Sequence, residues 1–485
     1  MIVKDKLFIG GRWVAPTTSD TVDVIGAATE EVLGRVPAGS RGDMDLAVVA
    51  ARRAFDTGPW PRMTPAERAD VMTRLSAAIQ VRYQEIAETI SQENGSPISF
   101  SIMGQVFAAT MVLDYYTALV RDFPFEESRQ GVLGPILVRR EPVGVVAGIV
   151  PWNVPLFVTM LKLAPALAAG CTLVLKPAPE TPLDAYQLAE CVEQAGIPEG
   201  VVNIVMADRE VGEYLVTHPD IDKVSFTGST LAGRRIASLC GERLRRCTLE
   251  LGGKSAAIIL DDANLESTIA GLYVPTSLMN NGQACVAQTR VLASRGRYDE
   301  VVEALVEATR GIKVGDPLDA ETVVGPLVAE RQRTRVEGYI AKGQEEGAKI
   351  AIGGGRPAGL AKGWYVEPTV FVGVDNKMTI AQEEIFGPVV VVIPYDDVDD
   401  AVAIANDSAY GLSGSVWSSD QQAALDVGRR IRTGTMGING MGMDFGGPFG
   451  GYKCSGIGRE LGPEGLQGYL EYKTITLGAG AAVGS

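Results

Sequence analysis

A cysteine stands among small and polar residues in the segment NNGQACVAQTR, which runs from Asn280 to Arg290. A structural cysteine usually packs among large aliphatic side chains, and Cys285 instead follows Gln283 and Ala284. Base rates favour a packing cysteine, and polar, glycine-containing surroundings shift the balance toward a reactive thiol only modestly. Cys285 is therefore a candidate nucleophile whose partners have to be found elsewhere in the chain.

The chain has a single histidine, His218, in the segment VTHPD. A serine or cysteine nucleophile activated by histidine would have to use this residue. A histidine before a Pro-Asp turn is more often a surface or capping residue, so we expect the chemistry to use Cys, Glu, Lys and backbone groups. Glu250, in CTLELGG, could act as a general base, and Asn153, in PWNVP, could donate hydrogen bonds. Taken singly, these two would be a solvated turn residue and an Asx-turn.

Composition excludes several classes of function. Six cysteines in 485 residues include no CxxC pair, so we expect no disulfide framework, no metal site and a reduced, cytoplasmic protein. A net charge of −15 argues against nucleic-acid and anionic-membrane partners. The longest apolar run, 163–175, is too short to span a bilayer, and the first residues lack the apolar core of a secretory signal. The segment GGKS at 252–255 is no P-loop, because Thr248 stands where a glycine is needed.

The elements that position these residues alternate between strand and helix from about residue 145 onward. Strands are predicted at VGVVAGIV, TLVLK, VVNIV, KVSFT and CTLEL, with helices between them. Such alternation is typical of βαβ units around a parallel sheet, whose ligands bind beyond the carboxyl ends of the strands. A second α/β set is predicted from Ala256 to about Gly440, as expected for a chain too long for one core. Earlier, Thr64, Pro65 and Glu67 predict a helix that begins with a capping box.

Seven motifs, in this order and at this approximate spacing, resemble the aldehyde dehydrogenase superfamily, in its hydrolytic, NAD(P)-dependent branch. They are PWNVP, KPAPETP, FTGST, ELGGK, GQAC, EEIFGP and PFGGYKCSGIGRE, and they cover nearly the whole chain. The resemblance implies an α/β fold with a Rossmann-like cofactor domain (1–121 and 142–252) and a catalytic α/β domain (253–453). It also implies a small β oligomerisation element (122–141 and 470–485) that joins subunits into a homodimer or homotetramer.

The resemblance also implies a mechanism. Cys285 aligns with the family's nucleophile, which attacks an aldehyde to form a thiohemiacetal and then a thioester. Asn153 and the Cys285 backbone N–H would stabilise the oxyanion, because preorganised donors need little reorganisation. Glu250 would activate the water that hydrolyses the thioester, and Lys162 would relay protons from that glutamate.

For the cofactor, the resemblance implies NAD, with NADP possible. Lys176 and Glu384 match residues that bind the two riboses. Phe386 would pack on the nicotinamide ribose, and the same cofactor site is expected to include Trp152, Gly228, Ser229 and Leu251. One residue departs from the pattern, because Pro179 stands where many NAD-dependent members carry a glutamate that bonds the adenine ribose. The next residue is Glu180.

The positions that line the family's aldehyde tunnel are occupied here by Val154, Val158, Leu161, Met443 and Phe449, with Asp444 nearby. They are mostly apolar, so we expect an uncharged aliphatic or aromatic aldehyde as substrate. Two alternatives stay open. One is a CoA-acylating relative, which generally lacks the glutamate found at Glu250. The other is a non-catalytic protein on the same fold, like the lens crystallins derived from this family, for which Cys285, Asn153 and Glu250 need not be kept together.

Overall fold

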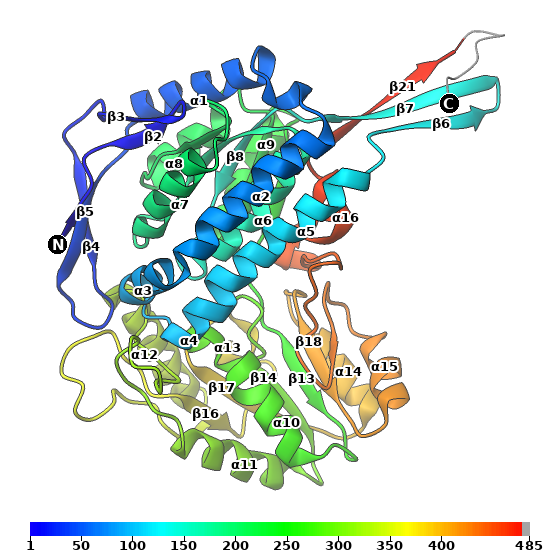
Figure 1. Ribbon diagram of the computed structural model, residues 1–485. Helices are drawn as coiled ribbons and strands as arrows, with labels where there is room; N and C mark the ends of the chain where they lie inside the picture. The colour runs from blue at the N-terminus through cyan, green and yellow to red at the C-terminus, as the bar shows by residue number, and fades with distance from the viewer. Residues whose placement is uncertain (478–485) are drawn as a thin grey trace.

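Two α/β bodies lie one above the other, and a narrow three-stranded sheet projects from the upper one (Figure 1). The computed structural model describes residues 1–477. The upper body contains an eight-stranded sheet. In order across the sheet, its strands are β20 (Gly456–Ile457), β12 (Arg246–Glu250), β11 (Lys223–Thr227), β8 (Val145–Ile149), β9 (Thr172–Lys176), β10 (Val202–Ile204), β2 (Leu7–Ile9) and β3 (Arg12–Val14).

The five strands predicted for this body are confirmed. They run parallel to one another, whereas the edge strands β20, β2 and β3 are antiparallel. CTLEL is shifted by one residue, since its strand begins at Arg246 and ends at Glu250. The helices that cover the sheet are α1 (Arg41–Asp56), α6 (Pro155–Ala169), α7 (Leu183–Gln194), α8 (Arg209–Thr217) and α9 (Thr230–Glu242).

The lower body contains the predicted second α/β set. Its seven-stranded sheet has the order β15 (Lys349–Ile352), β16 (Thr369–Val372), β17 (Val389–Tyr395), β14 (Arg290–Ser294), β13 (Ala256–Ile259), β18 (Gly414–Trp417) and β19 (Gly437–Ile438). Its helices are α10 (Leu265–Leu272), α11 (Tyr298–Arg310), α12 (Glu330–Glu345), α13 (Thr379–Gln382), α14 (Val398–Asn406) and α15 (Gln421–Gly428). Only residues 251–255 separate β12 of the upper sheet from β13 of the lower one, so the two sheets meet directly.

The projecting sheet consists of β6 (Glu126–Gly131), β7 (Gly134–Pro142) and β21 (Leu470–Thr476), all antiparallel (Figure 1). It joins the two segments expected to form one β element, although residues 478–485 of the second segment lie outside the described residues. A further small sheet near the N-terminus was not predicted, and it contains β1 (Ile2–Val3), β5 (Val32–Pro37) and β4 (Thr21–Ile25).

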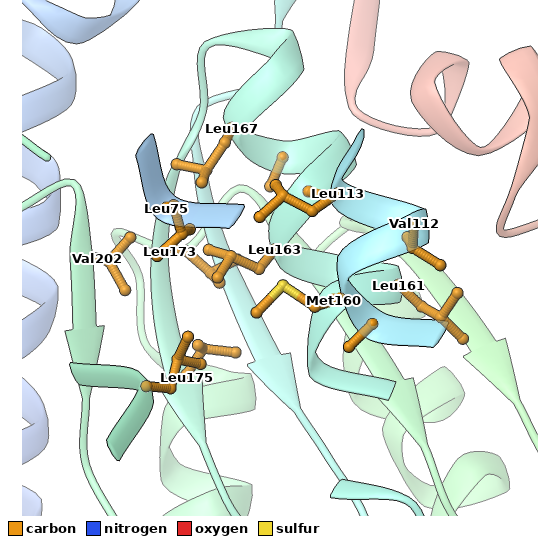
Figure 2. Close-up of a cluster of buried hydrophobic side chains, with 14 of the residues drawn as sticks. Leu75, Val112, Leu113, Met160, Leu161, Leu163, Leu167, Leu173, Leu175 and Val202 are labelled. Atoms are coloured by element: carbon orange, nitrogen blue, oxygen red, sulfur yellow. The ribbon is translucent and has the colours of Figure 1, made fainter. Parts of the chain in front are cut away.

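Two long helices cover the upper body. The predicted capping box opens α2 (Pro65–Val81), where the Thr64 backbone N–H donates to Glu67 Oε2 at 2.7 Å. A continuous helix from Ile98 to Asp122 comprises α4 (Ile98–Phe100), the π-helical η2 (Ser101–Phe107) and α5 (Ala108–Asp122). By length and composition alone, this helix could cross a membrane. It packs here against α2 and α6, with Val112 and Leu113 in the buried cluster of Figure 2, as a core helix does.

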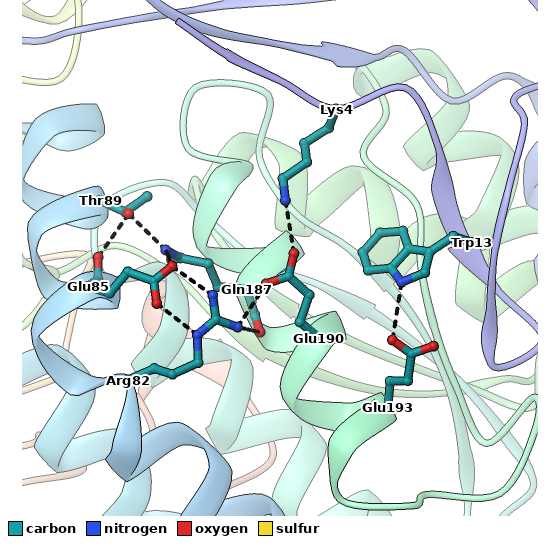
Figure 3. Close-up of polar contacts among 8 residues, drawn as sticks. All are labelled: Lys4, Trp13, Arg82, Glu85, Thr89, Gln187, Glu190 and Glu193. Carbon is teal, nitrogen blue, oxygen red and sulfur yellow. Dashed lines mark hydrogen bonds and ion pairs between the residues drawn. The ribbon is translucent and has the colours of Figure 1, made fainter.

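Helices α3 (Tyr83–Asn94) and α7 are joined by polar contacts. Arg82 pairs with Glu85 at 2.7 Å and with Glu190 at 2.8 Å, and Lys4 reaches Glu190 at 2.9 Å (Figure 3). Deeper between the same helices, Glu93 and Asp184 are fully buried, and Glu93 Oε1 accepts the Leu183 N–H at 2.9 Å. Within residues 1–477, Glu93 Oε2 and Asp184 Oδ1 have no hydrogen-bond partner.

These two carboxyl groups cannot both be ionised cheaply. Burial, with the neighbouring Asp184 carboxylate, raises the pKa of Glu93 well above its usual value, and burial also raises the pKa of Asp184. The folded protein therefore keeps a proton that the unfolded chain has already lost at the same pH. Stability supplied by this proton is present below the unfolded pKa, at about pH 4, and is lost as pH rises toward the raised folded values.

We expect Glu93→Gln to change this pH dependence. Gln keeps the acceptor for the Leu183 N–H but carries no charge, so the variant should gain stability relative to wild type as pH rises from about 4 toward 7, by up to about 1.4 kcal/mol per pH unit. Thermal unfolding midpoints measured across this range test the difference.

Glu190→Gln is the matched control. Contacts with Lys4 and Arg82 lower the pKa of Glu190, so its ion pairs are lost as pH falls and the penalty of that change should shrink at low pH. If the difference in stability between Glu93→Gln and wild type did not change with pH, the folded protein would not keep the extra proton on this buried pair.

Candidate active site

A cavity of about 500 Å³ lies where the carboxyl end of the upper sheet meets the lower body. Asn153 enters it from the loop after β8, Glu250 from the end of β12, and Cys285 from the loop after the short helical turn η4 (Met279–Gly282). The three candidates chosen from the sequence thus share one cavity, although the lower body supplies the thiol and the upper body supplies the other two.

The loop that carries Cys285 is held by two asparagines in left-handed backbone conformation. The φ angles are 52° at Asn280 and 60° at Asn281, a region that residues other than glycine rarely adopt. Asn281 Nδ2 donates to Gly95 O at 2.8 Å and to Pro326 O at 2.9 Å. Asn280 Nδ2 donates to the backbone oxygen of Asn153 at 2.9 Å. The strained turn therefore ties the cysteine loop to the asparagine loop across the two bodies.

The side-chain amide of Asn153 is fixed within the cavity wall. Only 5% of Asn153 is exposed, and its Nδ2 donates to Gln283 O at 2.8 Å. Asn94 Nδ2 donates to the Asn153 backbone oxygen at 2.9 Å, which holds the loop from the other side. An amide nitrogen has two N–H groups, so the second N–H of Asn153 is available to a ligand.

The environment of Cys285 differs from the polar setting that its sequence neighbours indicated. Gln283 is buried and turned into the protein, where its Oε1 accepts the Val328 N–H at 3.0 Å. Burial, together with the nearby carboxylates of Glu384 and Glu250, raises the pKa of the Cys285 thiol to about 12. The resting thiol is therefore protonated at neutral pH, and it needs a base before it can act as a nucleophile.

Glu250 is a buried carboxyl group rather than a solvated turn residue. It is 2% exposed, and neither of its side-chain oxygens has a hydrogen-bond partner within the described chain. Burial, followed by the neighbouring Glu460 carboxylate, raises its pKa well above the usual value. A raised pKa brings a carboxylate base closer to neutral pH, where it can take a proton and return it.

Lys162 lies behind Glu250 and makes the contact that the sequence did not indicate. Its Nζ donates to Glu460 Oε1 at 2.7 Å and to Thr227 Oγ1 at 2.7 Å. The lysine and glutamate side chains are 0% and 1% exposed. Glu460 also lines the cavity, so sequence reasoning missed a site residue that ends the quoted motif PFGGYKCSGIGRE. Its acidic type within a glycine-rich motif was the only signal available.

Most residues assigned to the cofactor line the same cavity. These are Trp152, Gly228, Ser229, Leu251, Glu384 and Phe386. Ser229 caps the N-terminus of α9, which supplies backbone N–H groups suited to phosphate oxygens. A side chain at Gly228 would lie 2.6 Å from the Phe226 ring, so glycine lets this turn pack closely against that ring. The Gly253 N–H donates to Glu384 Oε1 at 2.9 Å, while burial raises the pKa of Glu384 to about 7. The residues present fit a dinucleotide.

Lys176 and Pro179 lie outside this cavity wall, at the end of β9. Lys176 Nζ donates to Ala207 O at 2.8 Å and to Pro177 O at 3.0 Å, and burial lowers its pKa to about 8. Pro179 is half-buried. Glu180 does not take the place of the missing acid, because its carboxylate pairs with Arg331 of α12.

The aldehyde end of the cavity is apolar. All five tunnel positions named from the sequence line it: Val154, Val158, Leu161, Met443 and Phe449. Asp444 does not, since it is exposed and its carboxylate accepts the Gly446 N–H at 2.7 Å. The cavity has further apolar lining residues that no motif indicated, among them Phe100, Gly104, Ala108, Phe157, Met279, Met441 and Phe445.

Comparison with known proteins agrees with this geometry. Residues 13–475 match the model of the aldehyde dehydrogenase family. The chain is 49% identical to geranial dehydrogenase of Castellaniella defragrans, over 97% of this chain and 98% of that protein. It is 51% identical to an aldehyde dehydrogenase of Mycobacterium tuberculosis solved with NAD+, with a TM-score of 0.98 over 99% of this chain and all of the other. A mutant aldehyde dehydrogenase of Pseudomonas syringae, solved with NAD+ and octanal, is 43% identical, with a TM-score of 0.95 over 99% of this chain and 98% of the other. The family resemblance carried by the seven motifs is thereby confirmed, and this chain belongs to the aldehyde dehydrogenase family.

Proposed function

We propose that this protein oxidises an uncharged, apolar aldehyde to the carboxylic acid, with NAD as its cofactor and a thioester on Cys285 as intermediate. The convergence of Cys285, Glu250 and Asn153 in one buried cavity carries the proposal. NAD is supported by similar structures solved with NAD+ and by the fit of Ser229 and Glu384 to a dinucleotide. Bound NAD+ would supply the hydride acceptor.

The first half of the reaction depends on activation of the thiol and on a prepared oxyanion site. Cys285 Sγ bonds to the aldehyde carbon as its proton passes to water in the cavity. The developing oxyanion lies between the Cys285 backbone N–H and the second N–H of Asn153. These donors are fixed before the substrate arrives, so they stabilise the charge without reorganisation.

The second half needs a base that can be reused. Glu250 takes a proton from the water that attacks the thioester carbonyl, and Sγ then leaves as the carboxylic acid forms. The ion pair of Lys162 and Glu460 lies beside this carboxyl group and can take the proton onward. Retention of Glu250 in the cavity favours hydrolysis over acyl transfer to CoA, and the intact set of three residues favours an enzyme over a crystallin-like protein.

The apolar lining supports a neutral substrate. Among the described residues, Arg335 is the one cationic side chain that lines the cavity, and it donates to the Glu384 backbone oxygen. A carboxylate at the aldehyde end would therefore be desolvated without a partner, at a cost of several kcal/mol. The names of two relatives agree with this chemistry, since one is a geranial dehydrogenase and another was solved with octanal.

We propose further that the projecting sheet joins copies of this chain into a homodimer or homotetramer. Strand β21 has exposed Tyr472 and Ile475, and the turn between β6 and β7 exposes Val132 and Leu133 almost fully. Apolar side chains on a projecting element are typical of a surface that is covered in an assembly.

Glu250→Gln should separate the two halves of the reaction. Glutamine cannot take a proton from water, so steady turnover should fall on the order of 10²–10⁴-fold. Loss of the Glu250 charge also removes one cause of the raised thiol pKa, so thiohemiacetal formation should suffer less. We expect a burst of about one NADH per site, followed by slow turnover and an acyl adduct on Cys285 in intact-protein mass spectra.

Cys285→Ala is the control for that experiment, because it should bind NAD+ normally and give neither burst nor adduct. Steady turnover of Glu250→Gln at the wild-type rate would mean that another base serves deacylation. Loss of the burst without an adduct would mean that Glu250 is required for thiol activation itself.

A panel of aldehydes tests the substrate class. Octanal should exceed succinic semialdehyde in kcat/KM by at least about 10-fold, because the charged carboxylate must be desolvated. Gly104→Leu should lower kcat/KM for octanal more than for propanal, since a Cβ at Gly104 already lies 2.6 Å from the Phe100 ring of the tunnel wall. A preference for the charged aldehyde would reject the proposed class.

Removal of β21 tests the assembly proposal. A chain that ends at Leu470 lacks the strand that pairs with β7, and we expect a smaller mass by light scattering. A chain that ends at Leu477 keeps the strand and should match the full-length mass. Equal masses for all three proteins would remove the role of β21 in assembly.

A further inference from the structure

A row of polar side chains crosses the interior of the upper body on two neighbouring strands. Lys223, Ser225 and Thr227 alternate along β11, so they share one face of the sheet. Thr248 and Glu250 share the same face of β12, because Ser225 pairs with Thr248 and Thr227 pairs with Glu250 in the parallel register. Four of these five residues are at most 4% exposed, with Thr227 half-buried.

The alternate residues on these strands face the other way and are apolar. Val224, Phe226 and Leu249 belong to the core that packs beneath α9. Burying a polar group instead of an apolar one costs free energy unless it is hydrogen-bonded. The polar row therefore needs an explanation beyond stability, since the neighbouring face shows that apolar side chains fit this sheet.

Hydrogen bonds connect the residues of this row with one another and with groups that face it. At the catalytic end, Lys162 Nζ donates to both Thr227 Oγ1 and Glu460 Oε1 at 2.7 Å. In the middle, the Tyr469 hydroxyl donates to Ser225 Oγ at 3.2 Å. At the far end, Lys223 Nζ donates to Thr248 Oγ1 at 2.7 Å. The row thus extends from the catalytic carboxylate to a buried lysine without an apolar interruption.

The lysine end opens into a second cavity of about 420 Å³. Lys223 and Thr248 line it, and so do the exposed residues Arg246, Gly458, Glu464 and Gln467. Glu250 and Glu460 line the first cavity but not the second. The polar row is therefore the part of the protein that lies between the catalytic cavity and a separate solvent-accessible one.

The proposed reaction gives such a row a task. Aldehyde oxidation with hydrolysis releases protons beside Glu250, which is 2% exposed. The aldehyde fills one end of the catalytic cavity and the cofactor the other, so a proton cannot leave by either route while both are bound. A third route is needed if proton release is to keep pace with turnover.

Resting on that proposed function, we propose that this polar row conducts protons from Glu250 to the second cavity, with Lys223 as the last acceptor before solvent. The water proton taken by Glu250 passes to Glu460, and the Lys162 ammonium takes it from there as it gives one of its own protons to Thr227 Oγ1. The proton then passes through the Ser225 and Thr248 hydroxyls to the Lys223 amine. Residues two apart on a strand are separated by about 6.6 Å, so the step from Thr227 to Ser225 needs a bridging water. Only O–H and N–H bonds break and form, and no further reactant is needed.

The electrostatic setting of Lys223 suits a group that exchanges its proton near neutral pH. Burial lowers the pKa of its ammonium to about 8. The charged and titratable groups that face it are Cys247, Cys171, Glu460, Arg246 and the ring of Tyr469, at 4.9 Å from Nζ. A lysine that served only as a fixed cation would gain nothing from this depressed pKa.

Lys223→Met tests the route, because methionine fills the same space without a proton to exchange. Stopped flow should follow NADH absorbance and the release of protons to a pH indicator in the same turnover. We expect the NADH burst to be kept, while proton release and steady turnover fall by roughly 10-fold to 100-fold. Methylamine, small enough for the second cavity, should restore both in a concentration-dependent way.

Two further variants separate conduction from structure. Lys223→Arg keeps the charge and the donors but cannot give up its proton, so it should stay slow if the lysine conducts and recover if the lysine is structural. Gln467→Leu alters the cavity wall outside the row and should match wild type. Normal proton release in Lys223→Met, or recovery in Lys223→Arg, would overturn the inference. So would a loss in Lys223→Met that methylamine does not restore. Absence of aldehyde-dependent NADH in the wild type would instead reject the proposed function.

Discussion

The close approach of two loops to one glycine pair sets the geometry of this site. A Cβ at Gly253 would lie 2.4 Å from the Cys285 carbonyl oxygen, and a Cβ at Gly252 would lie 2.5 Å from Glu384 Oε2. Both distances are far shorter than any real contact of a side chain. A side chain at Gly253 would meet backbone and push the Cys285 loop away, whereas one at Gly252 would displace the Glu384 carboxylate. The positions of Cys285, Glu250 and Glu384 relative to one another depend on these two glycines.

A second constraint is electrostatic. The cavity gathers acidic groups away from water, and burial raises the pKa of Glu250 and of Glu384. The same burial, with these carboxylates, raises the pKa of the Cys285 thiol. Burial therefore favours the neutral forms of these acids and of the thiol, and Glu250 accepts a proton only in its ionised form, which the raised pKa makes a stronger base. The buried Lys162–Glu460 pair acts on Glu250 in both directions, because the Glu460 carboxylate raises the pKa of Glu250 and the Lys162 ammonium lowers it.

The sequence predicted what depends on local pattern. β9 and the capping box at Thr64 appear at the predicted residues, since short apolar runs and cap residues act over a few positions. Motif order identified the family, and it singled out Cys285, Glu250 and Asn153, which share one cavity. The site residues and properties that the sequence did not indicate depend on tertiary contacts. Glu460 becomes a site residue only because Lys162 reaches it across 298 positions, and the helix from Ile98 brings Gly104 to the tunnel without any motif. The raised pKa of the Cys285 thiol also escaped prediction, because it depends on burial and on the distant carboxylates of Glu384 and Glu250.

Pro179 stands where many NAD-dependent members of the family carry a glutamate, and the acid at the next position makes a different contact. An acid three residues after Lys176 would face the adenine-side ribose, and proline supplies neither charge nor donor there. The acid at the next position, Glu180, pairs with Arg331, which belongs to α12 of the lower body. Another residue of α12, Arg335, donates to the Glu384 backbone oxygen at 2.6 Å. The contact made by Glu180 therefore positions the helix that supports the nicotinamide-side carboxylate. The acid at position 180 therefore contacts the same helix whose Arg335 donates to the Glu384 backbone oxygen.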